Sequence, residues 1–336
     1  MERLTFSGGL GILGPVVYGM RLFGRMLPFP FVSLFFLTAV LRGAAESPQI
    51  RIAALPNNPR PGEPVTVGLT GAEGARWQAV LRNAQGQSLA KAAFFAIATD
   101  KDGGTVHAAV LAVPCTARAG SAQISVENAA GSIGSIALSI AGRDFISEEI
   151  PLDQRNTDLR TVQDPKKNAE ANTLWGILSR TGTEIYAADR FMPPVQSTRR
   201  TSFFGDRRVY RYTDGSKAAS IHAGIDYGVP TGTLVHACGP GKVVLARPRI
   251  VTGNSVIIEH LPGVYSLYYH LDQIAVREGF MVDTGTLIGR SGATGLATGP
   301  HLHWEIRISG ENTDPDALIA RPVLDKSAIL SIFNSF

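Results

Sequence analysis

Residues 301–308 read HLHWEIRI, a stretch in which polar and apolar side chains alternate. A period of two is typical of a β-strand with one face in a core. Residues i and i+2 of a strand share a face, so His301 and His303 point together. The opposite, core-facing set is Leu302, Trp304 and Ile306. A buried histidine needs one partner, and packing alone does not explain two histidines on one open face.

The sequence around this stretch predicts an antiparallel sheet. From Arg199 onward, short apolar runs are separated by tight turns that contain glycine, and this arrangement is typical of antiparallel strands. The candidate strands are 233–237, 242–246, 255–259, 264–270, 286–288 and 301–308. We expect a groove built from these strands to be the working surface.

The residues from about Ile50 to Ile140 predict a separate β domain. Apolar runs and turn signals recur there at a spacing of about 8–12 residues, as in a β-sandwich. The candidate strands are 50–55, 65–69, 77–82, 94–98, 105–113, 122–126 and 133–140. Seven such strands resemble an immunoglobulin-like domain, so the expected fold class is mostly β. His107 is expected to be an ordinary strand residue.

One helix is expected between the two β regions. Asp164 supplies an N-cap and Pro165 the first helical position, and apolar residues follow at helical spacing up to a stop near Gly182. Cys115 and Cys238 fall in different expected domains, so we expect free thiols. The expected parts are a leader (1–45), an immunoglobulin-like sandwich (46–145), a linker with one helix (146–198), a C-terminal antiparallel β domain (199–325) and a tail (326–336).

The first 45 residues predict an export signal. An apolar run, 27–41, follows Arg21 and Arg25 and precedes the small residues 43–45. We expect cleavage after Ala45 and a location in the periplasm or cell envelope. An uncleaved anchor is the alternative, although the run is shorter than the ~20 residues that cross a bilayer. Met20 is an alternative start, because it gives a shorter leader.

The net charge of +4 and the pI of about 9.1 do not indicate a nucleic-acid partner. The leader holds four arginines and one glutamate, which account for +3 of that charge. The remaining chain has no basic patch, so we expect no nucleic acid to bind.

A second motif, HAGID at 222–226, places His222 and Asp226 four residues apart on a glycine-containing turn or strand end. Two imidazoles and one carboxylate suit Zn²⁺, and three protein ligands with a fourth position left for water are typical of a catalytic zinc site. One of His301 and His303 should then bind the metal while the other faces the substrate. The residues alone do not say which.

At these residues the chain resembles the LytM/lysostaphin-type zinc endopeptidases, bacterial enzymes that cut peptide bonds in peptidoglycan. The resemblance covers about residues 204–315. Its motifs are FGDR (204–207), HAGID (222–226), YYHL (268–271) and TGPHLHWE (298–305). Each motif alone is weak, but their order, spacing and glycine-rich context together are specific.

The resemblance implies a role for each motif residue. It makes His222, Asp226 and His303 the ligands of one Zn²⁺ per chain. It makes His270 and His301 the catalytic pair. It also implies an exported zinc endopeptidase that hydrolyses peptidoglycan stem peptides or cross-links during cell-wall remodelling, with peptidoglycan as its macromolecular partner.

The sequence also supports predictions for three further residues. Glu305 continues the face of the two histidines at 301 and 303, where it is expected to orient an imidazole through a hydrogen bond. His236 lies two residues from Cys238 on a predicted strand, but a second metal site would need more ligands nearby. His260 precedes Leu-Pro-Gly and is expected to lie in a turn.

Two other functions are compatible with the sequence. In the first, the domain is a non-catalytic LytM-type regulator or scaffold of other cell-wall hydrolases. In the second, the sandwich is the principal module of an adhesion or anchoring protein. The sandwich is otherwise expected to be a spacer or docking module for an envelope protein. Only the enzyme should release soluble fragments from purified wall in a chelator-sensitive way.

Overall fold

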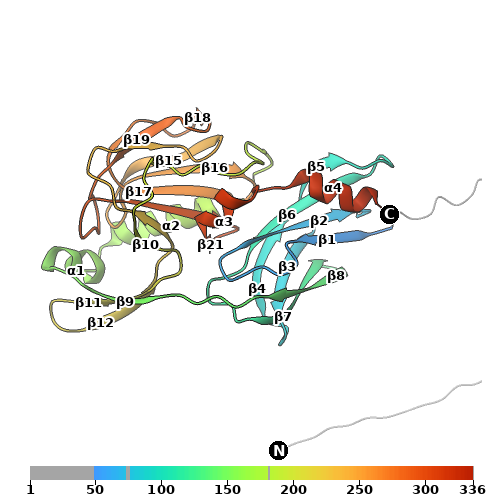
Figure 1. The fold of residues 1–336 in the computed structure, drawn as a ribbon, viewed down its shortest axis with the longest axis horizontal. Helices are drawn as coiled ribbons and strands as arrows, with labels where there is room; N and C mark the ends of the chain where they lie inside the picture. Colours follow the sequence, from blue (N-terminus) through green and yellow to red (C-terminus); the bar gives the residue numbers. More distant parts are fainter. Residues whose placement is uncertain (1–48, 73–75, 181, 336) are drawn as a thin grey trace, which may run out of the picture. The chain divides into compact units, whose positions relative to one another are not determined.

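The computed structural model describes residues 49–72, 76–180 and 182–335. The fold is mostly β with antiparallel sheets, which confirms the predicted fold class (Figure 1). The leader predicted at 1–45 lies outside the described residues. Among the residues that the structure does describe, no helix has both the length and the hydropathy needed to cross a bilayer.

Residues 51–140 form two four-stranded sheets that share one core. The first sheet has the order β1 (Arg51–Leu55), β2 (Pro64–Thr70), β6 (Thr105–Ala112), β5 (Phe95–Thr99). The second has the order β4 (Ser88–Ala93), β3 (Gln78–Asn83), β7 (Gly120–Asn128), β8 (Gly131–Ile140). Val67, Leu81 and Ile124 are fully buried between them, so the sheets form a sandwich. An immunoglobulin-like fold for this sandwich stays a prediction.

Strand β4 has no counterpart among the seven predicted strands. Its sequence, SLAKAA, contains three alanines and a lysine, which have low strand propensity. Pairing with β3 over Gln78–Arg82 makes this segment a strand despite its composition.

A ten-stranded sheet follows, in which every pairing is antiparallel. Its main path is β10 (Arg200–Ser202), β13 (Gly224–Tyr227), β20 (Leu302–Ile308), β17 (Val264–Ile274), β16 (Gly253–Leu261), β15 (Gly241–Arg249), β18 (Met281–Val282). Three strands pair off this path: β14 (Leu234–His236), β19 (Leu287–Ser291) and β21 (Glu311–Thr313). As predicted from the alternation, Leu302, Trp304 and Ile306 are fully buried.

Residues 146–198 are more structured than the expected linker with one helix. β9 (Ser147–Pro151) pairs in parallel with β11 (Arg207–Arg211), and β11 pairs with β12 (Lys217–Ile221) to complete a three-stranded sheet. Two helices follow β9 in the chain, α1 (Gln154–Thr161) and α2 (Pro165–Leu178). The sequence of α1, QRNTDLRT, contains one apolar residue and therefore has no hydrophobic periodicity to read.

Helix α2 starts where the sequence predicts, with the Asp164 side chain accepting a hydrogen bond from the amide of Lys166. It ends at Leu178 rather than near Gly182. Its buried residues Ile177 and Leu178 pack against a set on the ten-stranded sheet, Leu245, Ile257, Tyr265, Leu267 and Tyr269. The predicted linker therefore shares a hydrophobic core with the sheet.

The predicted tail, 326–336, contains helix α4 (Lys326–Asn334), which follows α3 (Pro315–Ala320). Ile329 and Phe333 of α4 are buried and lie against Gly68 of β2. A Cβ at Gly68 would come within 2.8 Å of Ile329 and 3.0 Å of Phe333, so only glycine allows this close approach. This helix thus packs on the first sheet of the sandwich.

Candidate metal centre and active site

Two neighbouring strands and one turn bring His222, Asp226 and His303 together. Asp226 on β13 and His303 on β20 are directly paired in the antiparallel register. His222 lies between β12 and β13, and its amide donates to the carbonyl of Asp206. All three side chains are buried. Residues 222 and 303, distant in sequence, therefore meet because β13 and β20 are adjacent.

The three donor atoms form a compact triangle. Nε2 of His222 lies 3.1 Å from Oδ1 of Asp226 and 3.0 Å from Nδ1 of His303. Nδ1 of His303 lies 2.8 Å from the same oxygen. Tetrahedral zinc with bonds of about 2.0–2.1 Å would separate its ligand atoms by roughly 3.3 Å, so small adjustments would admit the ion. Among the described residues, these three are the one set that could hold a metal.

The tautomer of His222 suits metal binding. Its Nδ1 lies 2.8 Å from the carbonyl oxygen of Phe203, which can only accept a hydrogen bond. Nδ1 therefore carries the proton, and Nε2 is left with a lone pair directed at Asp226 and His303. Hydrogen bonds of this kind commonly orient histidines that bind metals.

The local electrostatics favour positive charge at this position. Burial alone would raise the pKa of Asp226, but its interactions with the imidazoles of His222 and His303 outweigh burial and hold that pKa well below its usual range. Burial lowers the pKa of His303, but Asp226 and Glu305 outweigh this effect and raise it to about 9. Asp226 and Glu305 thus stabilise the protonated ring of His303, and a bound metal ion would take the place of the proton on Nδ1.

Two residues, Glu305 and Tyr269, hold the ring of His303 in place. Nε2 of His303 lies 3.4 Å from Oε2 of Glu305, where the sequence predicts an orienting hydrogen bond. Glu305 in turn contacts the guanidinium of Arg307. The ring of Tyr269 stacks on His303, with centroids 5.5 Å apart and an interplanar angle of 6°. The imidazole plane is thereby fixed with Nδ1 toward the metal position.

His270 and His301 lie beside this triangle, with ring centroids 4.8 Å apart. Nδ1 of His270 is 2.7 Å from the carbonyl oxygen of Thr294, and Nδ1 of His301 is 2.8 Å from that of Gly299. Each Nδ1 therefore carries a proton, which leaves a lone pair on Nε2 when the ring is neutral. Nε2 of His301 lies 3.8 Å from Oδ1 of Asp226, so this lone pair is close to the metal position.

The backbone and surroundings of His270 are unusual. Its φ of 61° lies in the left-handed region, which side chains other than glycine rarely adopt. Its amide donates to the carbonyl of Thr252, and this bond helps to hold the conformation. Burial is the main cause that lowers the pKa of His270 to about 3, with His301 and His303 adding to it. The ring is neutral at ordinary pH.

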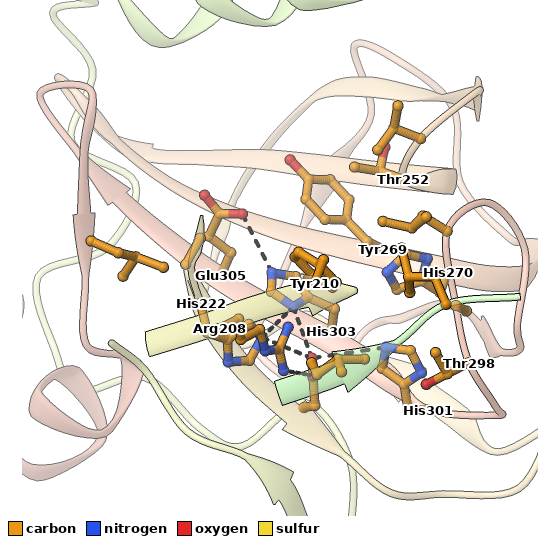
Figure 2. A pocket seen from close by; sticks show the side chains of 18 residues that line it. Arg208, Tyr210, His222, Thr252, Tyr269, His270, Thr298, His301, His303 and Glu305 are labelled. Carbon is orange, nitrogen blue, oxygen red and sulfur yellow. Dashed lines mark hydrogen bonds and ion pairs between the residues drawn. The ribbon is translucent and has the colours of Figure 1, made fainter. Parts of the chain in front are cut away.

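All five predicted site residues line one cavity of about 250 Å³ (Figure 2). Figure 2 shows His222, His303 and Arg208 close together, with His270 and His301 beside them. Sequence reasoning missed several lining residues that precede the motifs, among them Ile150 and Leu152, in and just after β9, and Arg208 on β11. They reach the cavity through the parallel pairing of β9 with β11, which leaves no local sequence signal.

The remaining histidines lie outside the cavity. The prediction of a turn at His260 is wrong, because this residue is fully buried on β16 and the turn begins after Leu261. Its Nδ1 lies 2.7 Å from the carbonyl oxygen of Pro240, and its Nε2 lies 2.7 Å from the hydroxyl of Ser266. Cys238 is a buried free thiol 3.7 Å from the same Nε2, and Cys115 is also free, as expected.

Comparison with known families assigns the segment that carries the site. Residues 220–315 match the sequence profile of Peptidase family M23. The chain contains an M23 peptidase domain. All five predicted site residues lie within this M23 domain, whereas Ile150, Leu152 and Arg208 lie before it.

Curated relatives of the M23 domain carry the names of peptidoglycan enzymes. Peptidoglycan DD-endopeptidase ShyA of Vibrio cholerae is 37% identical over 131 residues, which are 39% of this chain and 30% of ShyA. DD-carboxypeptidase/endopeptidase Mpg of Neisseria meningitidis is 41% identical over 122 residues, 36% of this chain and 27% of Mpg. The chain thus spans only about a third of these relatives' length.

A solved structure matches beyond the M23 domain. The putative peptidase M23 from Pseudomonas aeruginosa is 25% identical, with a TM-score of 0.54. The match covers 78% of this chain and 95% of that chain. The likeness therefore includes residues that precede the M23 domain.

Proposed function

We propose that this protein is an exported, zinc-dependent endopeptidase that hydrolyses peptide bonds in peptidoglycan stem peptides or cross-links. The observation that carries the proposal is the convergence of donor atoms from His222, Asp226 and His303 within 3.1 Å of one another. The Nε2 atoms of His270 and His301, whose Nδ1 atoms donate to backbone carbonyls, lie beside them in the same cavity. The peptidoglycan endopeptidases among the relatives support the substrate class.

His222, Asp226 and His303 would hold the zinc ion. When bound, zinc lowers the pKa of water to about 7 and polarises a scissile carbonyl. His301 and His270 each present a lone pair to the cavity, so each can accept a proton and later pass it to the leaving amine. Tyr269 and Glu305 keep the ring of His303 in place.

A non-catalytic regulator is the second candidate. A metallopeptidase domain that has lost catalysis is expected to lack metal ligands or proton-transfer groups. Here all five positions are filled, and the five residues converge in one cavity. This filled site favours the enzyme over the regulator.

The test uses purified protein that comprises residues 46–336. Metal content and digestion of peptidoglycan are measured on the same sample. We expect one zinc per chain and the release of soluble muropeptides from purified peptidoglycan. A chelator should abolish release and added zinc should restore it. A protein that binds peptidoglycan but releases nothing, with zinc present, would support the regulator instead.

Export is tested separately in the producing cell. We expect the protein in the envelope fraction with its N-terminus near Glu46. An intact Met1 or Met20 at the N-terminus would show that the leader is not cleaved and would support a membrane anchor.

A further inference from the structure

The two oxygens of the Asp226 carboxylate have different partners. Oδ1 faces the imidazoles of His222 and His303. Oδ2 accepts a hydrogen bond from Nη2 of Arg208 at 2.9 Å. The guanidinium therefore occupies the side of the carboxylate that is turned away from the metal position.

Arg208 is itself held by an acidic residue from outside the M23 domain. Its Nε donates to Oε1 of Glu148 at 2.8 Å. Glu148 lies on β9 and Arg208 on β11, and the two residues are directly paired in the parallel register. One guanidinium thus bridges Asp226 and Glu148 through two separate N–H groups.

The bridge is shielded from water. The side chain of Arg208 is 13% exposed and that of Asp226 is 9% exposed, whereas Glu148 is 34% exposed. A lysine could not replace the arginine fully, because one ammonium lacks the planar fork that reaches both carboxylates. Because both side chains are largely buried, the pair between Arg208 and Asp226 differs from a surface ion pair, which solvent would weaken.

The charges of Asp226, Arg208 and Glu148 explain why the bridge includes a second carboxylate. Arg208 alone would cancel the charge of Asp226 and make this carboxylate a poorer ligand for a cation. Glu148 restores a net charge of −1 to the group of three. The bridge can then fix the direction of Oδ1 without neutralising the site.

We propose that Arg208 is a positioning residue that orients Asp226 toward the metal, and that Glu148 of β9 holds Arg208 in place. This inference rests on the proposed zinc site. It makes β9, which lies about seventy residues before the M23 domain in the sequence, a part of the metal centre.

The structure supplies a matched control on the same two strands. Arg211 of β11 and Glu149 of β9 also form an ion pair, with Nε 3.5 Å from Oε1. Both side chains are well exposed, at 53% and 43%. Arg211 is not among the residues that line the cavity. Arg211→Ala therefore removes a similar charge pair at a distance from Asp226.

The experiment measures zinc affinity by chelator competition on metal-depleted protein, residues 46–336. Arg208→Ala should weaken zinc binding by about 10–100-fold, the usual effect of losing a residue that orients a metal ligand. Arg208→Lys should restore part of this loss, and Glu148→Gln should weaken binding by about fivefold. Arg211→Ala should leave zinc affinity unchanged. Circular dichroism and thermal unfolding of the metal-free proteins check the fold.

Each outcome separates the hypotheses. Wild-type zinc affinity in Arg208→Ala would overturn the positioning role, and so would a rise in KM with zinc affinity unchanged, since that indicates contact with substrate. If Arg208→Ala does not fold, unchanged affinity in both Glu148→Gln and Arg208→Lys would overturn the proposal. A wild-type protein that binds no zinc and cleaves no wall would instead overturn the proposed function.

Discussion

Asp226 of β13 and His303 of β20 are direct neighbours across the antiparallel register, and Nδ1 of His303 lies 2.8 Å from Oδ1 of Asp226. This pairing brings a carboxylate and an imidazole together at one position of the sheet. His301, which precedes β20, is joined to Gly292 by an isolated bridge instead. The two histidines of the HLH motif therefore hold different places in the cavity.

Because His303 and His301 occupy different positions, we expect substitution of His303 to reduce zinc content and substitution of His301 to reduce turnover. His303→Ala leaves one imidazole and one carboxylate for the metal, so zinc content should fall well below one per chain. His301→Ala should keep its zinc and its fold, while turnover falls by about 10²–10⁴, the usual contribution of a positioned acid–base group. Metal analysis and muropeptide release on the same samples measure both. Zinc lost from His301→Ala, or retained fully by His303→Ala, would reverse the two roles.

His270 should behave like His301, because its Nδ1 is also held by a backbone carbonyl and its Nε2 is free. His270→Ala should keep zinc and lose turnover by a similar factor of about 10²–10⁴. His236 is half-buried on β14 and lies outside the cavity, so His236→Ala is the control and should keep full activity. Full activity in His270→Ala would remove this residue from the mechanism.

Glu305 should affect the metal through His303. Glu305→Gln removes the negative charge that faces Nε2, so zinc affinity or turnover should fall by about 10–100-fold while the fold is kept. Chelator competition beside a turnover assay measures the two quantities. Glu311→Gln, a nearby acid on β21 that does not line the cavity, is the matched control. Equal zinc affinity and turnover in wild type and Glu305→Gln would show that His303 needs no orienting carboxylate.

His260 should make folding stability depend on pH. Burial lowers its pKa to about 4 in the folded state, against an ordinary value of 6.5. The unfolded chain therefore binds a proton below pH 6.5 while the folded protein stays neutral at this residue, and stability falls as the pH drops from 6.5 to 4. The full effect is about 3 kcal/mol. His260→Gln should flatten the curve over this range in urea unfolding; parallel curves for both proteins would contradict the assignment.

The packing of α2 predicts that a segment beginning at Arg199 is unstable. Removing α2 exposes the sheet residues that pack against Ile177 and Leu178. Burial of each of these two side chains contributes roughly 1.5–3 kcal/mol to the free energy of unfolding. A segment that begins at Asp144 keeps α2 and β9. We expect a clearly higher thermal midpoint and better solubility for 144–336 than for 199–336. Equal midpoints would show that the linker is dispensable.

Local patterns in the sequence predicted much of the site. The alternation in HLHWEIRI predicted a strand with a buried apolar face, and the observed β20 starts one residue later, at Leu302. The helical signal at Asp164 predicted the start of α2. The resemblance supplied the roles of His222, Asp226 and His303, and those roles stay predictions, although the structure brings the three residues together.

Pairings between distant segments could not be predicted in the same way. The parallel pairing of β9 with β11 joins Glu148 to Arg208, and nothing in either segment alone encodes it. Helix α4 is a different case, because a signal was present. Asp325 is a capping residue, and Ile329 and Phe333 repeat at a spacing of four, which is typical of a helix.

The contact of Gly68 with Ile329 and Phe333 also affects how the chain acquires its structure during synthesis. Strand β2 emerges from the ribosome more than 250 residues before the helix that covers it. Contacts over such a separation form late, because the entropy of closing the intervening loop opposes them. The first sheet therefore stays partly uncovered until residues 326–334 arrive, and its apolar surface is exposed to aggregation during that interval.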